Sequence, residues 1–441
     1  MLQKVFPDPF RNQLVIITMY YLPVPLSALH DLFIQILVLH LLVQIYFTNR
    51  RLYGNYCSML KKRPFWIKKV LDAWEKRPVV WMSGVRRVGK TTLARMFDDS
   101  VYMNCDLPSV VRSLADPELF FDGLEKDTIV IFDEVHRLED PSRLLKIGAD
   151  VYSHVKILAT GSSTLAATKK FKDGLTGRKQ SIYLTPVLWE ECQDVFSIKD
   201  LDHRLLHGGL PEALLNEVKD PSFFSEWIDS FYARDIQELF GIRNRVGFIK
   251  LLNLLLRQSG GLIDYSNLAK LCDISRPTVK AHIEAMSIAH ALFLLSPFHG
   301  GGRREITLRP KCYGFDTGFI AFVKGWDTIH EDDRGLLWEH LVLDTLRTFV
   351  NPADIYYWRD KSGREIDFVI KAGGRRVHVI ECKINPDRFD AKQLIAFRDL
   401  YPIGDNYVVS PRVISPHRQR YKGQIINYYS LKKLPSVFGM S

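Results

Sequence analysis

The fold of this 441-residue chain is decided by one stretch, Gly84-Val85-Arg86-Arg87-Val88-Gly89-Lys90-Thr91. Before it, residues 79–82 are apolar and predict a buried strand; after it, residues 91–97 carry apolar side chains at helical spacing. A GxxxxGKT pattern between a strand and a helix forms a phosphate-binding loop, because its glycines let successive backbone N–H groups face an anion. We therefore expect Lys90 to contact the phosphates of ATP and Thr91 to ligate Mg²⁺. Thr92, the next residue, is expected to contact the nucleotide as well.

A run of apolar residues that ends in two acids lies downstream, at residues 128–134. Four apolar residues in a row are typical of a strand that is buried on both faces of a parallel sheet. At the end of such a strand, Asp133 can hold Mg²⁺ through water and Glu134 can polarise an attacking water. The alternative is a buried strand that ends in two solvated acids.

A third predicted strand, residues 156–160, runs into Gly161 and Ser162, so a hydroxyl of Thr160 or Ser162 could sense a γ-phosphate. Together these motifs resemble those of AAA+ ATPases, in which an additional strand lies between the phosphate-loop strand and the acidic strand. The resemblance implies that Ser162 or Thr160 is the polar residue called sensor 1 in that family. It also implies ATP and Mg²⁺ as cofactors.

Residues 59–185 alternate predicted strands with predicted helices, which indicates an α/β core with a parallel sheet covered by helices. Arg178 follows the third motif, where an arginine finger could reach the γ-phosphate of its own or a neighbouring subunit. A homo-oligomer is therefore one possible assembly. The alternative for Arg178 is a solvated surface side chain.

The composition is that of a folded protein with a basic excess, since 46% of the residues are hydrophobic, 25% are charged and the net charge is +10. A basic balance favours polyanionic partners such as DNA, although a nucleotide site also needs basic residues. The six cysteines are scattered without a CxxC pair. This spacing argues against a zinc site or a disulfide framework and favours the cytoplasm.

The first 58 residues are set apart by an apolar segment between residues 14 and 47. The best window for a membrane span, residues 26–47, contains Asp31, which would cost about 3 kcal/mol near the middle of a span. The window at residues 14–22 is too short to cross a bilayer. We interpret residues 1–58 as an extension from a misassigned start codon, with a membrane anchor as the alternative.

Residues 186–240 predict a helical lid, and residues 241–298 predict a winged helix-turn-helix. Pro211 in the lid belongs to a run that resembles the GxP element touching adenine in the signal-transducing branch of AAA+ proteins; an ordinary helix start is the alternative. In the second module, Ser275 caps a helix and residues 292–295 form a wing strand. The side chains expected to face a DNA groove are Arg276, Thr278, Lys280 and His282. A packing unit or a protein dock is the alternative for this module.

The last predicted domain, residues 299–441, is basic, with 23 Lys and Arg against 17 Asp and Glu. Asp367 begins one predicted strand, and the next strand ends in Glu381-Cys382-Lys383. This spacing places two carboxylates and an ammonium at one rim of a hairpin. There the carboxylates could bind Mg²⁺, and Lys383 could steady an attacking hydroxide.

This hairpin resembles the PD-(D/E)xK nuclease fold, whose helical Glu and later Gln match Glu339 and Gln393. The resemblance implies that Glu339 joins Asp367 and Glu381 as a metal ligand, although Ile366 stands where the motif has Pro. A degenerate scaffold held by a salt bridge is the alternative to an active nuclease. The basic tail at residues 411–433 suits a nucleic acid backbone or a solvated face.

From residue 59 onward the chain resembles prokaryotic AAA+ ATPases fused to a C-terminal domain with nuclease-type motifs. The resemblance implies a cytoplasmic, Mg²⁺-dependent ATPase whose hydrolysis gates a DNA-directed, endonucleolytic module. The alternative is an ATP-driven signalling scaffold whose nuclease-like domain cuts nothing.

Overall fold

The computed structural model describes residues 61–161, 169–300 and 309–438. Contacts divide the chain into Met1–Lys61 and Lys62–Ser441, so the described residues belong almost entirely to the second unit. The interpretation of residues 1–58 concerns residues outside the described ranges, as does the prediction for Ser162. Within those ranges, no helix combines the length and the apolar character that crossing a bilayer requires.

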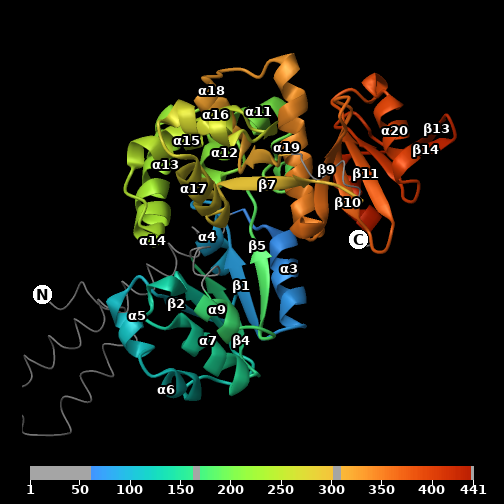
Figure 1. Cartoon of the computed structure of the whole chain (residues 1–441). Coiled ribbons are helices and arrows are strands. Elements are labelled where there is room, and N and C mark those ends of the chain that lie inside the picture. The colour runs from blue at the N-terminus through green and yellow to red at the C-terminus, as the bar shows by residue number, and fades with distance from the viewer. Residues whose placement is uncertain (1–60, 162–168, 301–308, 439–441) are drawn as a thin grey trace, which may run out of the picture. The chain divides into compact units, whose positions relative to one another are not determined.

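The first sheet is parallel throughout and has the strand order β2-β3-β4-β1-β5 (Figure 1). Its strands are β1 (Val79–Ser83), β2 (Ser100–Asn104), β3 (Ile129–Asp133), β4 (Lys156–Thr160) and β5 (Lys179–Tyr183). The predicted parallel α/β core is therefore confirmed. As the resemblance implied, β4 lies between the phosphate-loop strand and the acidic strand.

Helices bury both faces of this sheet, which is why β1 is buried along its whole length. Val80 and Met82 of β1 pack in one apolar core with α3, whereas Val79 and Trp81 pack in the other with α7. Polar groups therefore collect at the strand ends rather than on the faces. The helices and the helical turn of this part are α3 (Pro64–Trp74), α4 (Lys90–Ala94), α5 (Pro108–Ser113), α6 (Pro117–Asp122), η2 (Val135–Arg137), α7 (Pro141–Asp150) and α9 (Lys169–Gly174).

A helical region follows the first sheet and packs onto the phosphate loop. Trp227 and Phe231 share an apolar core with Val85 and Val88 of that loop. The elements of this region are α10 (Trp189–Asp194), α11 (Leu201–His207), α12 (Pro211–Leu215), α13 (Pro221–Ser230), η3 (Phe231–Gln237), α14 (Glu238–Phe240) and α15 (Arg245–Arg257).

The two helices of the predicted helix-turn-helix are α16 (Tyr265–Cys272) and α17 (Arg276–Ile288). The predicted cap is present, because Ser275 Oγ accepts the backbone N–H of Thr278 at 3.2 Å. The prediction that His282 faces outward is wrong, since His282 is 4% exposed and its ring centroid lies 5.4 Å from that of Phe248. Helical spacing places His282 on the same buried stripe as Val279.

A second sheet, with nine strands among the described residues, begins beside these helices and continues into the C-terminal part, in the order β13-β14-β12-β11-β10-β9-β7-β8-β6. Strand β7 (Leu292–Pro297) pairs with β8 (Lys311–Gly314) and, at its end, with β9. Strand β8 also pairs with β6 (Gly261–Leu262). Residues beyond the predicted boundary at 298 thus complete the strands beside α17, and α18 (Thr317–Lys324) packs on α11 and α15.

The C-terminal part places helices on both faces of this sheet. Helix α19 (Glu331–Phe349) packs against β11, and α20 (Lys392–Leu400) packs against β10. The remaining strands are β9 (Ile355–Arg359), β10 (Glu365–Lys371), β11 (Val377–Cys382), β12 (Asn406–Val409), β13 (His417–Tyr421) and β14 (Gln424–Tyr429). Short helical turns lie at η4 (Pro352–Asp354), η5 (Pro386–Arg388) and η6 (Leu431–Phe438).

Candidate functional site

The phosphate loop starts where β1 ends and closes on the first turn of α4. Gly84 has a φ of 156°, and a Cβ there would lie 2.6 Å from the carbonyl oxygen of Leu184, so a side chain is excluded. Gly89, with a φ of 98°, caps α4. Lys90 Nζ donates to the carbonyl oxygens of Gly84 and Val85 at 2.9 and 3.1 Å. The loop's own backbone therefore holds the lysine ammonium in place.

The two acids predicted from the sequence stand at the carboxyl end of β3. Asp133 is 3% exposed; its Oδ2 accepts from the Tyr102 hydroxyl at 2.5 Å, and its Oδ1 accepts from the Thr160 hydroxyl. The backbone N–H of Glu134 donates to Thr160 Oγ1 at 3.1 Å. Thr160, at the end of the neighbouring strand β4, thus contacts the Asp133 carboxylate and the Glu134 backbone. This is the position that the resemblance implied for the sensor residue.

Glu134 leaves β3 with left-handed backbone geometry, at a φ of 55°. Such a conformation costs about 1–3 kcal/mol for a residue other than glycine, and it recurs at turns as well as at functional sites. Glu134 Oε2 lies 3.2 Å from His136 Nδ1. Burial alone would raise the pKa of Glu134, but the hydrogen bond with His136 and the charge of Lys90 bring that pKa below its ordinary value. The carboxylate is therefore kept ionised.

Asp235, on the π-helical turn η3, is a member of this site that the sequence reasoning missed. Its Oδ2 lies 3.4 Å from Arg86 Nε in the phosphate loop. Burial raises the pKa of Asp235, while the positive charges of Arg86 and Lys90 act in the opposite direction. Trp227 Nε1 also donates to the Arg86 carbonyl oxygen, at 2.9 Å. No motif marks Asp235, because its approach depends on how η3 packs over the loop.

Pro211, the residue predicted to touch adenine, begins α12 beside the phosphate loop. A Cβ on Gly89 would lie 3.9 Å from Pro211 Cγ, which is ordinary van der Waals contact. The next residue, Glu212, lies 3.6 Å from Arg87 of the loop, measured between Oε2 and Nη1. The structure thus brings Pro211 and the loop together, whereas contact with a base stays a prediction.

Arg178 lies at the opposite edge of the first sheet. Its carbonyl oxygen accepts the N–H of Val79 at the start of β1, at 3.4 Å, whereas the phosphate loop follows the end of β1. A five-residue strand spans about 16 Å. The guanidinium pairs with Asp150 at 2.5 and 2.9 Å. The prediction that Arg178 reaches the γ-phosphate of its own subunit is therefore wrong, and contact with a neighbouring subunit stays a prediction.

The carboxylates predicted for the C-terminal part also converge, in the β10–β11 hairpin. The register that pairs Phe368 with Ile380 sets Asp367 beside Glu381. Lys383 Nζ lies 2.8 Å from Glu381 Oε2 and 3.6 Å from Asp367 Oδ2. Gln393, by contrast, is exposed near the start of α20.

Glu339, on α19, belongs to the same carboxylate cluster. Its Oε1 accepts from the Tyr313 hydroxyl and lies 3.6 Å from Lys311 Nζ. Burial, reinforced by the negative charge of Asp367, raises the pKa of Glu339 to about 7 and that of Glu381 to about 8. Burial would lower the pKa of Lys311, but Glu339 and neighbouring acids raise it above its ordinary value.

In the described ranges, no three His, Cys, Asp or Glu side chains are placed to hold a metal ion together. The metal-binding role of Glu339, Asp367 and Glu381 therefore stays a prediction. Lys383 and Tyr313 engage carboxylate oxygens of the cluster, on Glu381 and Glu339 respectively. One oxygen, Glu381 Oε1, is buried without a hydrogen-bond partner among the described residues.

Three family models match consecutive parts of the chain. Residues 76–193 match an AAA domain, residues 198–330 match a domain of unknown function (DUF8612) and residues 334–434 match another domain of unknown function (DUF4143). The second match includes β8 and α18, in agreement with their packing beside α11 and α15.

Relatives of this chain occur in bacteria and archaea. The chain is 27% identical over 330 residues to the uncharacterized protein Rv2008c of Mycobacterium tuberculosis, which covers 72% of this chain and 73% of that protein. It is 26% identical over 321 residues to the uncharacterized protein MJ1544 of Methanocaldococcus jannaschii, covering 65% and 70%. Among solved structures, the Walker-type ATPase PABY2304 of Pyrococcus abyssi is 15% identical, with a TM-score of 0.39 over 60% of this chain and 96% of that one.

The AAA-domain match falls on the part of the chain that carries the parallel sheet, the phosphate loop and the two acids of β3. The matches further along the chain name no activity. Residues 76–193 are therefore an AAA domain of the P-loop ATPase type.

Proposed function

We propose that this chain binds and hydrolyses ATP at the carboxyl edge of the first sheet, with Mg²⁺ as cofactor. The observation that carries the proposal is the meeting of three elements there: the loop with Lys90, the two acids at the end of β3, and Thr160 of β4, which contacts the Asp133 carboxylate and the Glu134 backbone. Phosphoryl transfer needs little covalent chemistry from a protein and depends on positioning and charge. This edge supplies both.

Each residue of the site has a separate role in this proposal. Lys90 binds the phosphates, and Glu134 orients the attacking water and accepts its proton. Thr160 senses the γ-phosphate, a role for which Ser162 is the alternative. Thr91 and Asp133 would hold Mg²⁺, since their hydroxyl and carboxylate are the hard oxygen donors that this ion prefers. When bound, Mg²⁺ neutralises charge on the phosphate oxygens. Pro211 would contact adenine.

Nucleotide binding is tested by titrating a fluorescent ATP analogue into wild type and Lys90→Ala. Loss of a charge-assisted hydrogen bond should weaken binding by roughly tenfold or more. Lys76→Ala, at an exposed lysine after α3, is the matched control and should bind as wild type does. Equal affinity of Lys90→Ala and wild type would contradict the proposal.

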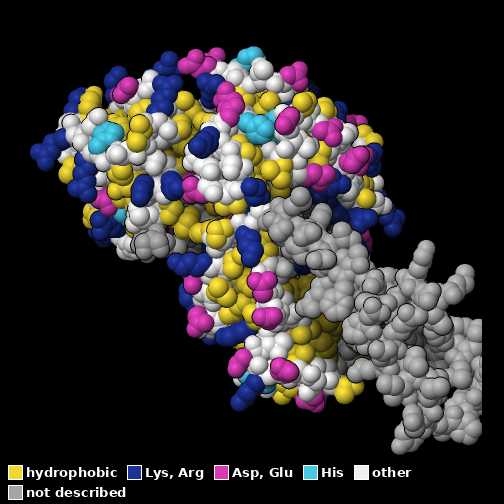
Figure 2. Space-filling view, turned by 180° about the vertical axis from the view of Figure 1, so that it is seen from behind, with side chains coloured by type: hydrophobic (Ala, Val, Ile, Leu, Met, Phe, Trp, Pro, Cys, Tyr) yellow, Lys and Arg dark blue, Asp and Glu magenta, His cyan; other side chains and the backbone are white. Residues whose placement is uncertain are grey.

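We propose further that the C-terminal part acts on DNA as a metal-dependent endonuclease controlled by the ATPase. The pairing of Asp367 with Glu381 beside Lys383 supports this activity. Exposed basic side chains on α17, the second helix of a proposed winged helix-turn-helix, and on β13 offer contacts to a phosphate backbone. On the face shown in Figure 2, Lys and Arg are mixed with Asp and Glu. A DNA interface would therefore be confined to a small basic area rather than extend over this whole face.

Helix α19 offers a physical route between the two sites. It carries Glu339 of the carboxylate cluster and, two turns later, Arg347. The Arg347 guanidinium lies 4.7 Å from the ring centroid of Tyr183, the last residue of β5 in the ATPase sheet. A shift of the first sheet on hydrolysis would therefore reach the cluster through one rigid element.

The rival function is a nucleotide-driven switch whose C-terminal part cuts nothing. The cluster favours this function in one respect, because Lys383 and Tyr313 engage its carboxylates and no three-ligand site is formed among the described residues. A degenerate catalytic centre held by ion pairs would look this way.

Plasmid nicking separates the two functions. Wild type with Mg²⁺ or Mn²⁺ and ATP should nick supercoiled plasmid if the nuclease function holds, and Asp367→Ala should not. Asp387→Ala, at an exposed aspartate of the same part, should nick as wild type does. Absence of nicking by wild type with either ion would favour the switch.

A further inference from the structure

The buried carboxylate of Asp133 is held from both sides by neighbouring strands of the first sheet. Strands β2 and β4 flank β3 in the sheet order. Tyr102 of β2 donates its hydroxyl to Oδ2 of Asp133, and Thr160 of β4 donates to Oδ1. A carboxylate that is 3% exposed needs such partners, because a buried charge without hydrogen bonds is costly. The two hydroxyls together therefore fix the direction in which the carboxylate points.

Tyr102 also contacts the helix that follows the phosphate loop. Its ring packs against the guanidinium of Arg95, with 4.8 Å between Arg95 Cζ and the ring centroid. Arg95 is the C-terminal cap of α4, and Lys90 and Thr91 begin the same short helix. Tyr102 thus contacts both elements that carry the proposed Mg²⁺ ligands, because its ring meets α4 and its hydroxyl meets β3.

We propose that Tyr102 is a positioning residue for Mg²⁺, an inference that rests on the ATPase function proposed above. Its hydroxyl orients Asp133 toward the ion, and its ring keeps α4, with Thr91, at the separation from β3 that the ion requires. Tyr102 acts through Asp133 rather than on the nucleotide. Groups that hydrogen-bond a metal-ligating carboxylate tune metal affinity, and their removal typically weakens it by about 10- to 100-fold. A tyrosine that merely joins two strands would affect stability and leave metal affinity unchanged.

The test is the affinity of the full chain for a fluorescent, non-hydrolysable ATP analogue, measured once with Mg²⁺ and once with EDTA. The factor by which Mg²⁺ tightens binding of the analogue equals, by linkage, the factor by which the protein tightens binding of Mg²⁺ to the analogue. Tyr102→Phe keeps the ring and loses only the hydroxyl, so this Mg²⁺ factor should be roughly tenfold smaller than in wild type. The affinity in EDTA should equal that of wild type, since the phosphate loop is unchanged.

Tyr152→Phe is the matched control for the loss of a tyrosine hydroxyl. The Tyr152 hydroxyl donates to Asp122 Oδ1 at 2.6 Å, which is the same kind of hydrogen bond within the same AAA domain. Tyr152 precedes the start of β4, whereas the nucleotide site lies at the other end of that strand. Tyr152→Phe should therefore keep the wild-type Mg²⁺ factor.

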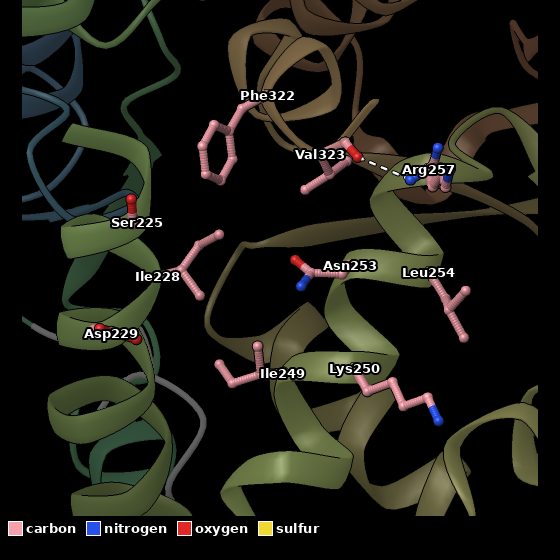
Figure 3. Close-up of a pocket in the computed structure, with 10 residues that line it drawn as sticks. All are labelled: Ser225, Ile228, Asp229, Ile249, Lys250, Asn253, Leu254, Arg257, Phe322 and Val323. Atoms are coloured by element: carbon pink, nitrogen blue, oxygen red, sulfur yellow. Dashed lines mark hydrogen bonds between the residues drawn. The ribbon is translucent and has the colours of Figure 1, made fainter. Parts of the chain in front are cut away.

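A smaller loss is expected from Arg95→Met, which removes the cation beside the Tyr102 ring and keeps the hydroxyl. The Mg²⁺ factor should fall roughly twofold. Lys250→Met is the control for the loss of a positive charge. Lys250 lies on α15 at the groove between α13, α15 and α18, and Figure 3 shows its side chain extending away from that groove. Lys250→Met should leave the Mg²⁺ factor unchanged.

The outcomes separate this inference from the ATPase proposal. A wild-type Mg²⁺ factor in Tyr102→Phe would overturn the inference and leave nucleotide binding intact. Equal weakening of Tyr102→Phe in Mg²⁺ and in EDTA would also overturn it, because Tyr102 would then support the phosphate loop rather than the ion. A larger loss in Arg95→Met than in Tyr102→Phe would contradict the role given to the hydroxyl. Failure of wild type to bind the analogue in either condition would overturn both proposals.

Discussion

Two places in the molecule combine acids with a lysine at strand ends, and they hold their glutamates in opposite states. At the ATPase site, His136 and Lys90 lower the pKa of Glu134 despite burial. In the carboxylate cluster, burial and the nearby Asp367 raise the pKa of Glu381 to about 8. The difference lies in the number of acids that share one buried space.

At the ATPase site, neutral hydroxyls carry much of the hydrogen bonding. Tyr102 and Thr160 bind Asp133, so the lysine is left to the phosphate loop. In the cluster, lysines bind the acids directly, as Lys311 does with Glu365 at 2.5 Å. The ATPase site therefore retains positive charge that can bind an anion together with its cation. In the carboxylate cluster, by contrast, the protein's own lysines already neutralise the acids.

The largest effect on stability is expected from Lys311→Met. Lys311 is 4% exposed and serves both Glu365 and Glu339. Removal of the ammonium leaves buried acids without a counter-charge, which should cost about 3–5 kcal/mol of unfolding free energy in urea titrations. Lys392→Met, at an exposed ion pair with Asp390, is the control and should change little. Similar losses of unfolding free energy in both variants would show that the positive charge of Lys311 does not stabilise the carboxylate cluster.

The pH dependence of stability should expose the raised pKa of Glu381. Between its ordinary value of 4.5 and about 8, the folded state binds more protons than the unfolded state, so stability falls as pH rises through this window. Glu381→Gln cannot ionise. Its stability relative to wild type should therefore increase with pH, by at most about 1.4 kcal/mol per unit. A difference that is constant from pH 5 to pH 8 would mean that Glu381 is ionised throughout.

A smaller effect is expected at the ATPase site from Asp235→Asn. The substitution removes a negative charge near Lys90 and frees Arg86. Since ATP is an anion, it should bind roughly fivefold more tightly, by about 1 kcal/mol. Asp229→Asn, at an exposed residue of α13, is the control for a general change in charge. Weaker ATP binding by Asp235→Asn would instead indicate that Asp235 is needed to position Arg86.

The smallest effect is expected from Arg178→Ala, which lies away from both sites. ATP affinity should change by less than roughly twofold, since Arg178 pairs with Asp150 at the other edge of the sheet. Turnover measured across a range of protein concentrations tests the remaining role. If Arg178→Ala lowers turnover only at concentrations where subunits associate, Arg178 acts on a neighbouring subunit.

Local patterns were sufficient to predict the ATPase sheet. The apolar runs at β1 and β4 give the strand bounds, and the glycines and acids that follow them mark the carboxyl edge. The same reasoning located Asp367, Glu381 and Lys383, because polar residues near the ends of two successive antiparallel strands meet at one rim of the hairpin.

Features that depend on packing between distant segments could not be predicted. Lys311 and Tyr313 come to the carboxylate cluster on β8, a strand that pairs with β7 across residues 298–310. Asp235 approaches the phosphate loop only through η3. His282 follows a polar pattern in sequence but faces Phe248 of α15 once the helices pack.

The measurement that bears most directly on the ATPase assignment is a comparison of bound and hydrolysed ATP in Glu134→Gln. The amide retains the size of the side chain but cannot accept a proton, so ATP should bind with wild-type affinity while single-turnover hydrolysis slows by about 100-fold or more. Hydrolysis by Glu134→Gln at the wild-type rate, with ATP bound equally well, would contradict the account.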